Sequence, residues 1–354
     1  ALPIFSLTLC RGFDAPPGLS YPSPGPKAQE GRVLASQSSG GSHERIGRYE
    51  VLRKIATGGM AELFLAKQVG MEGFERVVAL KRILAHLAYD EEFINMFRDE
   101  ARIVAKLSHP NIVQIFDLGK AEDTYFIAME YISGRDMSRV VPKAEKLGIS
   151  FPLEYAMSIA ASVLDGLAYA HAKTDDFGEP LKVVHRDITP ENIMVGWNGN
   201  VKILDFGIAK ANTQSDQTRA GEIKGKLSYM SPEQVGGEPL DRRADVWSLG
   251  VTMFEALCLE RPFEASTAHG LLAEIRYEEP RRALDINPTL GEELGVVLET
   301  ALERDIARRY KSALDLAEDL ARLRRREPIT ARPASRSLRL RRWVQRYPVL
   351  FALI

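Results

Sequence analysis

The sequence predicts an α+β fold of two lobes: a small first lobe of five strands and one helix, and a larger, mainly helical second lobe. Its 354 residues, 45% hydrophobic and 27% charged, suit a globular chain of about two structural units. Strand-like segments fill residues 49–131, and helix-like periodicity dominates after Gly134.

The first lobe is predicted over about residues 48–131. In the sequence, three of its strands precede and two follow a predicted helix, Glu91–Leu107, whose apolar residues recur at helical spacing. The expected strands are Tyr49–Ile55, Ala61–Gln68, Val77–Arg82, Ile112–Leu118 and Tyr125–Tyr131.

The second lobe is predicted over about residues 132–326, which makes residues 48–326 one folded domain. A long apolar-periodic helix, Leu153–Ala172, is followed by a turn-rich loop at 174–180. Short strands are expected at Ile193–Val195 and Val201–Leu204, and helices from there to about Arg326.

Two flanking segments differ in composition from this domain. Residues 1–47 are rich in Pro, Gly and Ser, so we expect a disordered leader. Residues 327–354 are expected to form an Arg-rich tail with a short apolar end; ten arginines and one acid occur between Arg322 and Arg346.

The overall composition points to no special partner or compartment. The formal net charge is −1, and no stretch of about 18 apolar residues occurs. The two cysteines, Cys10 and Cys258, show no disulfide or ligand spacing. We expect a cytoplasmic protein, with the inner face of a membrane as the alternative.

The strongest chemical signal is the run His185-Arg186-Asp187-Ile188-Thr189-Pro190-Glu191-Asn192. Asp205-Phe206-Gly207 follows, with Asp205 18 residues after Asp187. An Asp at a strand end can accept a proton from a hydroxyl group, and Asn192 and Asp205 offer the hard oxygen ligands that Mg²⁺ prefers. The two motifs at this spacing predict phosphoryl transfer from ATP.

These motifs resemble those of the protein kinase family, in particular the bacterial eukaryotic-like serine/threonine kinases, over roughly residues 48–323. The resemblance implies the bilobal protein-kinase fold and the use of ATP with Mg²⁺, or alternatively Mn²⁺. It implies that Asp187 is the catalytic base, that Asn192 and Asp205 are metal ligands, and that Arg186 pairs with a phosphorylated activation segment.

The same resemblance assigns a nucleotide site. Lys81 in Val78-Ala79-Leu80-Lys81 would grip the α- and β-phosphates and pair with Glu100. The phosphate-covering loop would be Ala56 to Leu63, where Ala56 and Ala61 replace two of the family's three glycines and Gly58 and Gly59 allow close backbone approach. The remaining nucleotide contacts would be Leu63, Ala79 and Met194 around adenine, Met129 at the back pocket, Glu130, Tyr131 and Ile132 at the hinge, and Asp136 at the ribose.

Other matches support the fold rather than the chemistry. The resemblance implies that Asp245 braces the catalytic loop and that Arg309 pairs with Glu233 at the end of the activation segment. It also implies a stacked spine of Val104, Ile115, His185 and Phe206.

Two positions depart from the family pattern. The family has Lys two residues after the catalytic Asp and Thr after the Gly of the activation segment, whereas this sequence has Thr189 and Lys226. We interpret this as an exchange in which Lys226 supplies the cation near the γ-phosphate and Thr189 the hydroxyl beside Asp187. The alternative is drift in a weakened or inactive kinase.

Regulation and tail function are left open by the sequence. Thr213, Ser215, Thr218 and Ser228 are candidate phosphorylation sites. The Arg-rich tail is compatible with an anionic membrane surface, with nonspecific nucleic-acid contact, or with a solvated role; no specific nucleic acid is expected.

The predicted function is therefore a signalling serine/threonine protein kinase that acts on protein hydroxyls and on itself. A pseudokinase scaffold and tyrosine specificity are the alternatives. Oligomeric state is not predicted.

Overall fold

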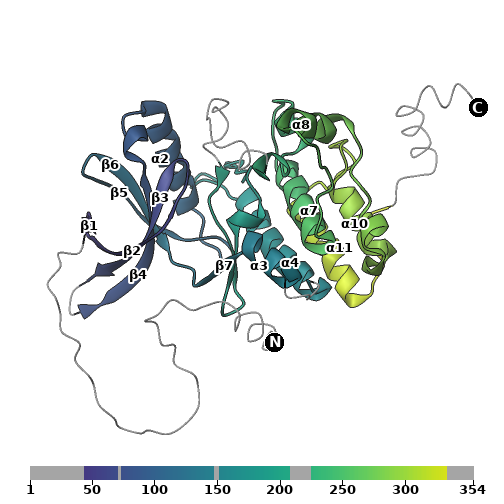
Figure 1. The fold of residues 1–354 in the computed structure, drawn as a ribbon, viewed down its shortest axis with the longest axis horizontal. Helices are drawn as coiled ribbons and strands as arrows, with labels where there is room; N and C mark the ends of the chain where they lie inside the picture. Colours follow the sequence, from purple (N-terminus) through teal and green to yellow (C-terminus); the bar gives the residue numbers. More distant parts are fainter. Residues whose placement is uncertain (1–43, 71–72, 147–150, 208–224, 333–354) are drawn as a thin grey trace, which may run out of the picture. The chain divides into compact units, whose positions relative to one another are not determined.

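The computed structural model describes residues 44–70, 73–146, 151–207 and 225–332 (Figure 1). The chain divides into two compact units. The first contains the described part of Ala1–Tyr89 with Phe116–Ser133 and Trp197–Gly199. The second contains Asp90–Ile115, Gly134–Gly196 and the described residues from Asn200 onward.

The first unit is a six-stranded sheet in the order β1-β2-β3-β4-β6-β5. The adjacent strands β1 and β2, β2 and β3, β3 and β4, and β4 and β6 pair antiparallel. The strands are β1 (Arg45–Ile46), β2 (Tyr49–Thr57), β3 (Ala61–Val69), β4 (Glu75–Ile83), β5 (Ile115–Ala121) and β6 (Thr124–Glu130).

Alternation along these strands builds the core of the sheet unit. Tyr49 is buried and packs edge-on against Phe126, with ring centroids 5.8 Å apart. The cluster comprises Ile46, Tyr49, Val51, Phe64, Ala66, Val78, Leu80, Phe126 and Ala128. Between β2 and β3, the Gly58 N–H donates to the Ala61 carbonyl at 2.9 Å and closes the predicted glycine turn.

The second unit is mainly helical and carries one small sheet. Its sheet has the order β7-β8-β9, with β7 (Gly134–Asp136), β8 (Ile193–Gly196) and β9 (Val201–Ile203). Its longer helices are α2 (Glu91–Ala105), α3 (Met137–Lys146), α4 (Leu153–His171), α7 (Arg243–Cys258), α8 (Ala268–Tyr277), α10 (Glu292–Ala301) and α11 (Ala313–Arg325).

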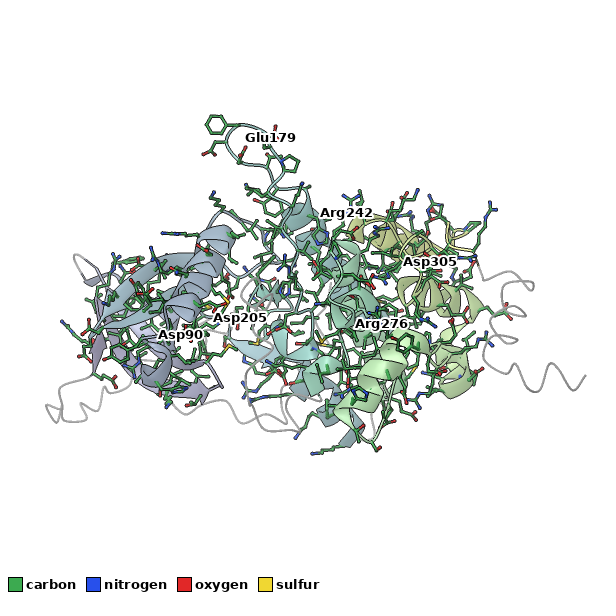
Figure 2. All side chains as sticks on the ribbon, turned by 90° about the horizontal axis from the view of Figure 1, so that it is seen from above. Asp90, Glu179, Asp205, Arg242, Arg276 and Asp305 are labelled. Atoms are coloured by element: carbon green, nitrogen blue, oxygen red, sulfur yellow. The ribbon has the colours of Figure 1, made fainter. Side chains whose placement is uncertain are left out.

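Helix α7 is the centre of this unit because nearly all its side chains are buried. Trp247 is fully buried and stacks on Phe263, with ring centroids 5.8 Å apart. Helix α2 is capped by Asp90, which is labelled in Figure 2. The Asp90 carboxylate accepts a hydrogen bond from the Phe93 amide at 3.0 Å. Such capping and burial fix the lengths of helices that the periodicity alone leaves uncertain.

The predicted two-lobed α+β fold is confirmed, with differences of detail. Strand β1 was not predicted because two residues carry no alternation pattern, although Ile46 is buried. Residues 112–114 precede β5; Ile112 and Val113 instead bond to β9, where the Val113 amide donates to the Ile203 carbonyl at 2.9 Å. Helix α2, expected in the first lobe, groups with the helical unit.

The helical unit continues past residue 326, the predicted end of the domain. Ile329 and Ala331 pack against its core, and the backbone amides of Thr330 and Ala331 donate to Asp319 on α11 at 2.7 and 2.9 Å. Buried Asp319 thus holds the first described residues of the expected tail.

None of the helices in the described ranges is both long enough and apolar enough to cross a membrane.

Candidate active site

The catalytic-loop motif forms a compact turn in the helical unit. Residues Pro190–Asn192 make the short helix η3, which leads directly into β8. The Asn192 side-chain amide donates to the Asp187 backbone carbonyl and to its carboxylate Oδ2, both at 2.8 Å. One carboxamide therefore orients the carboxylate that the sequence predicts as catalytic base.

Asp245, at the start of α7, holds the backbone of this loop through its carboxylate. Its carboxylate accepts hydrogen bonds from the amides of His185 at 2.8 Å and Arg186 at 2.7 Å. Arg186 has φ of 67°, a left-handed conformation that costs a non-glycine residue energy and is retained where surrounding contacts impose it. The predicted bracing role of Asp245 is confirmed.

His171, the last residue of α4, is a member of this arrangement that the sequence did not reveal. Its Nε2 lies 2.8 Å from Oδ2 of Asp245, and both side chains are buried. Burial alone would raise the pKa of Asp245, but the His171 hydrogen bond and charge, with the His185 contacts, hold it below its usual value. The only sequence signal was a histidine at a predicted helix end.

Asp205 and Gly207 lie against the same loop. The Gly207 amide donates to the His185 carbonyl at 2.8 Å, and the Leu204 amide donates to the Asn192 carbonyl at 2.9 Å. A Cβ on Gly207 would lie 2.9 Å from Cβ of Asp187, so only glycine allows this approach. Asp205, labelled in Figure 2, has φ of 37°. The structure thus brings together Asp187, Asn192 and the strand end that carries Asp205.

The four predicted spine residues belong to the core of the helical unit. His185 and Phe206 are fully buried, with ring centroids 4.5 Å apart, and burial lowers the pKa of His185. Val104 is buried in the same core, and Ile115 packs against it.

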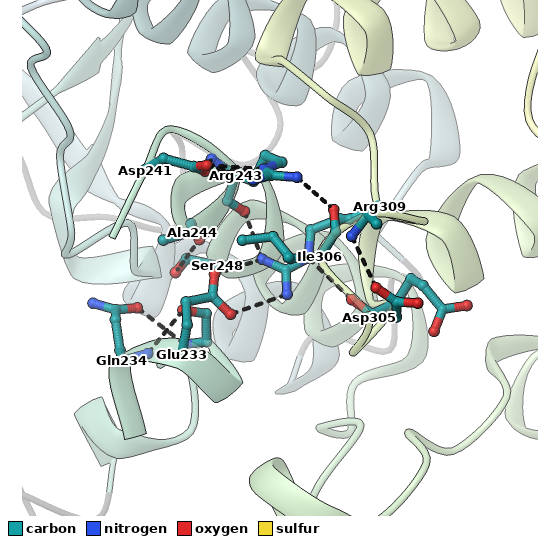
Figure 3. Close-up of polar contacts among 12 residues, drawn as sticks. Glu233, Gln234, Asp241, Arg243, Ala244, Ser248, Asp305, Ile306 and Arg309 are labelled. Carbon is teal, nitrogen blue, oxygen red and sulfur yellow. Dashed lines mark hydrogen bonds and ion pairs between the residues drawn. The ribbon is translucent and has the colours of Figure 1, made fainter. Parts of the chain in front are cut away.

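The end of the activation segment is anchored by a buried ion pair (Figure 3). The Arg309 guanidinium donates to Glu233 Oε1 at 2.7 Å and to Oε2 at 3.1 Å. Gln234 in turn donates to the Arg186 carbonyl at 3.0 Å, which connects this anchor to the catalytic loop. The predicted pairing of Arg309 with Glu233 is confirmed.

Thr189 and Lys226 both belong to the helical unit but differ in exposure. Thr189 is buried, whereas the Lys226 side chain is about half exposed and its Nζ lies 3.9 Å from Oε2 of Glu191. Ser228 is also buried and accepts a hydrogen bond from Arg261 at 3.2 Å. This burial makes Ser228 a poor phosphate acceptor. Thr213, Ser215 and Thr218 lie outside the described residues.

Most of the predicted nucleotide residues lie on neighbouring strands of the sheet unit. In the strand register, Lys81 on β4 lies opposite Leu63 on β3 and Ile127 on β6, and Ala79 lies opposite Met129. The predicted set in this unit is Ala56, Gly58, Gly59, Leu63, Ala79, Lys81, Met129, Glu130 and Ile132.

The other predicted nucleotide residues lie in the helical unit. Asp136 on β7 is the antiparallel partner of Met194 on β8, so these two are adjacent. The Asp136 carboxylate also forms an ion pair with Arg139, with an N–O distance of 3.2 Å. Glu100 lies buried on α2. Lys81 and Glu100 therefore belong to different units, and their pairing stays a prediction.

The donor set fits a magnesium ion bound jointly with a nucleotide. The described residues contain no group of three or more His, Cys, Asp or Glu side chains arranged to hold a metal alone. Mg²⁺ typically takes one or two protein oxygen ligands and completes its shell with phosphates and water. Asn192 and Asp205 supply that number.

A strand-rich unit and a helical unit with this catalytic loop define a two-lobed, kinase-type phosphotransferase. Residues 49–330 match the family description "Protein kinase domain". The chain belongs to the protein kinase family, whose members generally use ATP and divalent metal ions and act on protein substrates.

Curated relatives include a tyrosine-protein kinase, MasK, from Myxococcus xanthus, 46% identical over 77% of this chain and 42% of that protein. The serine/threonine-protein kinase PrkC from Bacillus subtilis is 35% identical over 77% of this chain and 40% of that protein. The crystal structure of the Mycobacterium tuberculosis PknI kinase domain is 26% identical, covers 80% of this chain and 99% of that one, and gives a TM-score of 0.60. The chain thus spans about two fifths of the length of these curated relatives.

Proposed function

We propose that this protein transfers the γ-phosphate of ATP to serine or threonine hydroxyls on proteins, including its own chain. The observation that carries the proposal is the pair of hydrogen bonds from Asn192 to Asp187, which fixes a carboxylate beside a predicted metal ligand. Phosphoryl transfer needs positioning and charge stabilisation more than covalent chemistry, and this loop is suited to both.

In this proposal, Asp187 accepts the proton of the attacking hydroxyl. Asn192 and Asp205 hold the divalent metal, with Mg²⁺ preferred over Mn²⁺. The bound metal neutralises phosphate charge. Asp245 and Gly207 act by positioning, since each fixes the backbone that carries Asp187.

We propose that the nucleotide is bound by the residues that the family resemblance assigns to it. Lys81, oriented by Glu100, grips the α- and β-phosphates, and the Ala56–Leu63 loop covers them through the backbone of Gly58 and Gly59. Ala79, Leu63, Met194 and Met129 enclose adenine, Glu130 and Ile132 form the hinge contact, and Asp136 binds ribose. Within the sheet unit, the strand pairing of Ala79 with Met129 supports its part of this assignment, and within the helical unit the pairing of Asp136 with Met194 supports its part.

Tyrosine specificity is the second candidate, and two observations favour it. The relative at 46% identity is named a tyrosine-protein kinase, whereas PrkC at 35% is named a serine/threonine-protein kinase. Thr189 also departs from the serine/threonine pattern, while Pro190 agrees with it. Several bacterial relatives carry the serine/threonine name, which supports the first candidate.

The test is transfer of labelled phosphate from Mg²⁺–ATP to the chain itself and to a generic basic acceptor protein. Asp187→Asn is the control, because it keeps the side-chain shape but removes the base. Incorporation that disappears in this variant supports a kinase, and phosphoamino-acid analysis separates Ser/Thr from Tyr. Nucleotide binding without any transfer would instead support a scaffold.

Autophosphorylation of the activation segment is the expected mode of regulation, with Thr213, Ser215 and Thr218 as acceptors and Arg186 as their partner. Buried Ser228 serves as an internal negative control in phosphopeptide mapping. A phosphate found mainly on Ser228 would contradict this assignment.

The Arg-rich tail is assigned to the inner surface of an anionic membrane, because clustered Arg attracts acidic headgroups. Cosedimentation with vesicles of acidic and of neutral lipid tests this. Equal binding to both, or none, would leave the tail as a solvated segment, and competition by RNA would indicate nonspecific nucleic-acid contact.

A further inference from the structure

The hydroxyl of Thr189 is an unused polar group at the centre of the catalytic loop. Thr189 is only 2% exposed, and its buried Oγ1 has no hydrogen-bond partner within the described ranges. The turn of the loop is closed through the Thr189 backbone instead, since its carbonyl accepts from the backbone amide of Asn192 at 3.0 Å. Buried hydroxyls are nearly always bonded, so this one is placed for a donor that arrives during function.

A cation lies on the segment that faces this loop. The Nζ of Lys226 is 3.9 Å from Oε2 of Glu191, the residue immediately before Asn192. Both side chains are more than half exposed, at 52% and 59%, so the pair is weak and the ammonium group can leave it.

The backbone that carries Lys226 is firmly held even though its side chain is loose. The Tyr229 amide donates to the Lys226 carbonyl at 3.3 Å, and the Tyr229 carbonyl accepts from the buried Ser248 hydroxyl at 2.8 Å. The Tyr229 hydroxyl donates to Glu255 on α7. Lys226 therefore carries an exposed ammonium group on a hydrogen-bonded backbone segment, close to Glu191 of the catalytic loop.

The charge balance of the loop calls for such a cation. Asp187, Glu191 and Asp205 place three carboxylates on the loop and the strand end that packs on it, and Arg186 is the one arginine or lysine in these two segments. A nucleotide triphosphate brings further negative charge, and its transfer is accelerated by fixed positive charge at the γ-phosphoryl oxygens.

We propose that Lys226 contacts the γ-phosphoryl oxygens during transfer and that Thr189 Oγ1 accepts a hydrogen bond from its ammonium group, which holds it beside Asp187. This deepens the proposed kinase function and rests on it. Lys226 is then a catalytic residue and Thr189 a positioning residue.

The reaction step balances without another co-reactant. The acceptor hydroxyl oxygen bonds to the γ-phosphorus while the bond from that phosphorus to the β–γ bridging oxygen breaks. The hydroxyl proton passes to the Asp187 carboxylate, and ADP leaves. Lys226 keeps its proton throughout and neutralises negative charge on the γ-phosphoryl oxygens.

The first test compares Lys226→Thr, Thr189→Lys and the double variant, with the exposed Lys311→Thr as matched control. We expect Lys226→Thr to lower kcat about 100-fold or more at saturating Mg²⁺–ATP, with little change in the KM for the acceptor. The double variant should regain activity to within about tenfold of the parent, because it returns one cation and one hydroxyl to the same place. Full activity in Lys226→Thr would overturn the proposal, and so would a double variant no better than the worse single variant.

The second test does not depend on turnover. Calorimetric titration measures the affinities of the parent and the Lys226→Thr variant for Mg²⁺–ATP and Mg²⁺–ADP. We expect the variant to lose at least fivefold in its preference for ATP over ADP while Lys311→Thr keeps it. If the parent binds nucleotide but transfers nothing, loss of that preference still supports Lys226, and only the kinase proposal fails. If the preference is unchanged in Lys226→Thr, the inference fails whatever the activity.

Discussion

Arg309 and Glu233 form a two-pronged ion pair inside the helical unit, with N–O distances of 2.7 and 3.1 Å and almost no exposure of either side chain. The guanidinium also donates to the Arg243 carbonyl at 2.9 Å (Figure 3). It donates to the Glu303 carbonyl at 3.0 Å as well, and it lies over the Trp247 ring. One side chain therefore ties the end of the activation segment to the start of α7 and to the turn after α10.

Breaking this pair should destabilise the protein strongly. Arg309→Met leaves the Glu233 carboxylate buried without a countercharge, and we expect the free energy of unfolding to fall by about 3–5 kcal/mol. Denaturant titration measures it. The exposed pair of Arg322 and Glu318, 3.2 Å apart, is the matched control, and Arg322→Met should cost less than about 1 kcal/mol. Equal losses in the two variants would contradict the assignment.

Substitution of Gly207 should impair transfer more than stability. The Cβ of Gly207→Ala would lie 2.9 Å from Cβ of Asp187 and 3.2 Å from the His185 carbonyl, so the catalytic loop must shift. A displacement of about 1 Å at the reacting group costs roughly 100-fold in rate, and we expect kcat to fall by about that factor. Gly178→Ala is a useful comparison because no atom lies within 4 Å of its added Cβ, although its φ of 87° adds strain. Unchanged kcat in Gly207→Ala would show that the loop absorbs the methyl group.

Much of the site was predictable because its residues lie close together in the sequence. Asp187 and Asn192 are five residues apart, and one turn brings the amide onto the carboxylate. The anchors Asp245 and Arg309 were found through resemblance, since nothing in their local sequence indicates partners 60 and 76 residues away.

What escaped prediction depends on tertiary contacts between distant segments. His171 reaches Asp245 across 74 residues, and a histidine at a helix end is an ordinary feature. Strand β1 is only two residues long, so it exists because Ile46 joins the sheet core and not because of its own pattern. Ile112 and Val113 have strand-like side chains, yet the Val113 amide donates to the Ile203 carbonyl and Ile112 forms a β-bridge with Ile203, which places them outside β5.

Removal of His171 should affect both stability and catalysis. Without the imidazole, the buried carboxylate of Asp245 loses a 2.8 Å partner and keeps only its backbone donors. We expect His171→Ala to cost about 2–3 kcal/mol of unfolding free energy, and kcat to fall because the Arg186 backbone is held less firmly. The exposed His269→Ala provides the comparison and should stay near the parent in both assays. A stable and fully active His171→Ala protein would rule out the bracing role.

Asp319 should make the stability of the helical unit depend on pH in the acidic range. Burial opposes its ionisation, but hydrogen bonds from the Thr330 side chain and amide, from the Ala331 amide and from the Tyr310 hydroxyl hold its pKa below the usual value. A carboxyl group whose pKa is lower in the folded state contributes stability that is fully present well above its unfolded pKa, about 3.9, and is lost as pH falls through the folded value.

Asp319→Asn should therefore lower the free energy of unfolding at pH 7 and flatten its decline below about pH 5, because the group that takes up the proton is gone. Thermal unfolding across that range measures the slope. Hydrogen exchange at the Thr330 and Ala331 amides should accelerate in the same variant, since both amides donate to this carboxylate. Exposed Asp315, which caps the start of α11 with Ser312, is the control, and Asp315→Asn should leave those two amides protected. An Asp319→Asn protein with parental acid sensitivity and slow exchange at both amides would show that the segment is held by Ile329 and Ala331 packing alone.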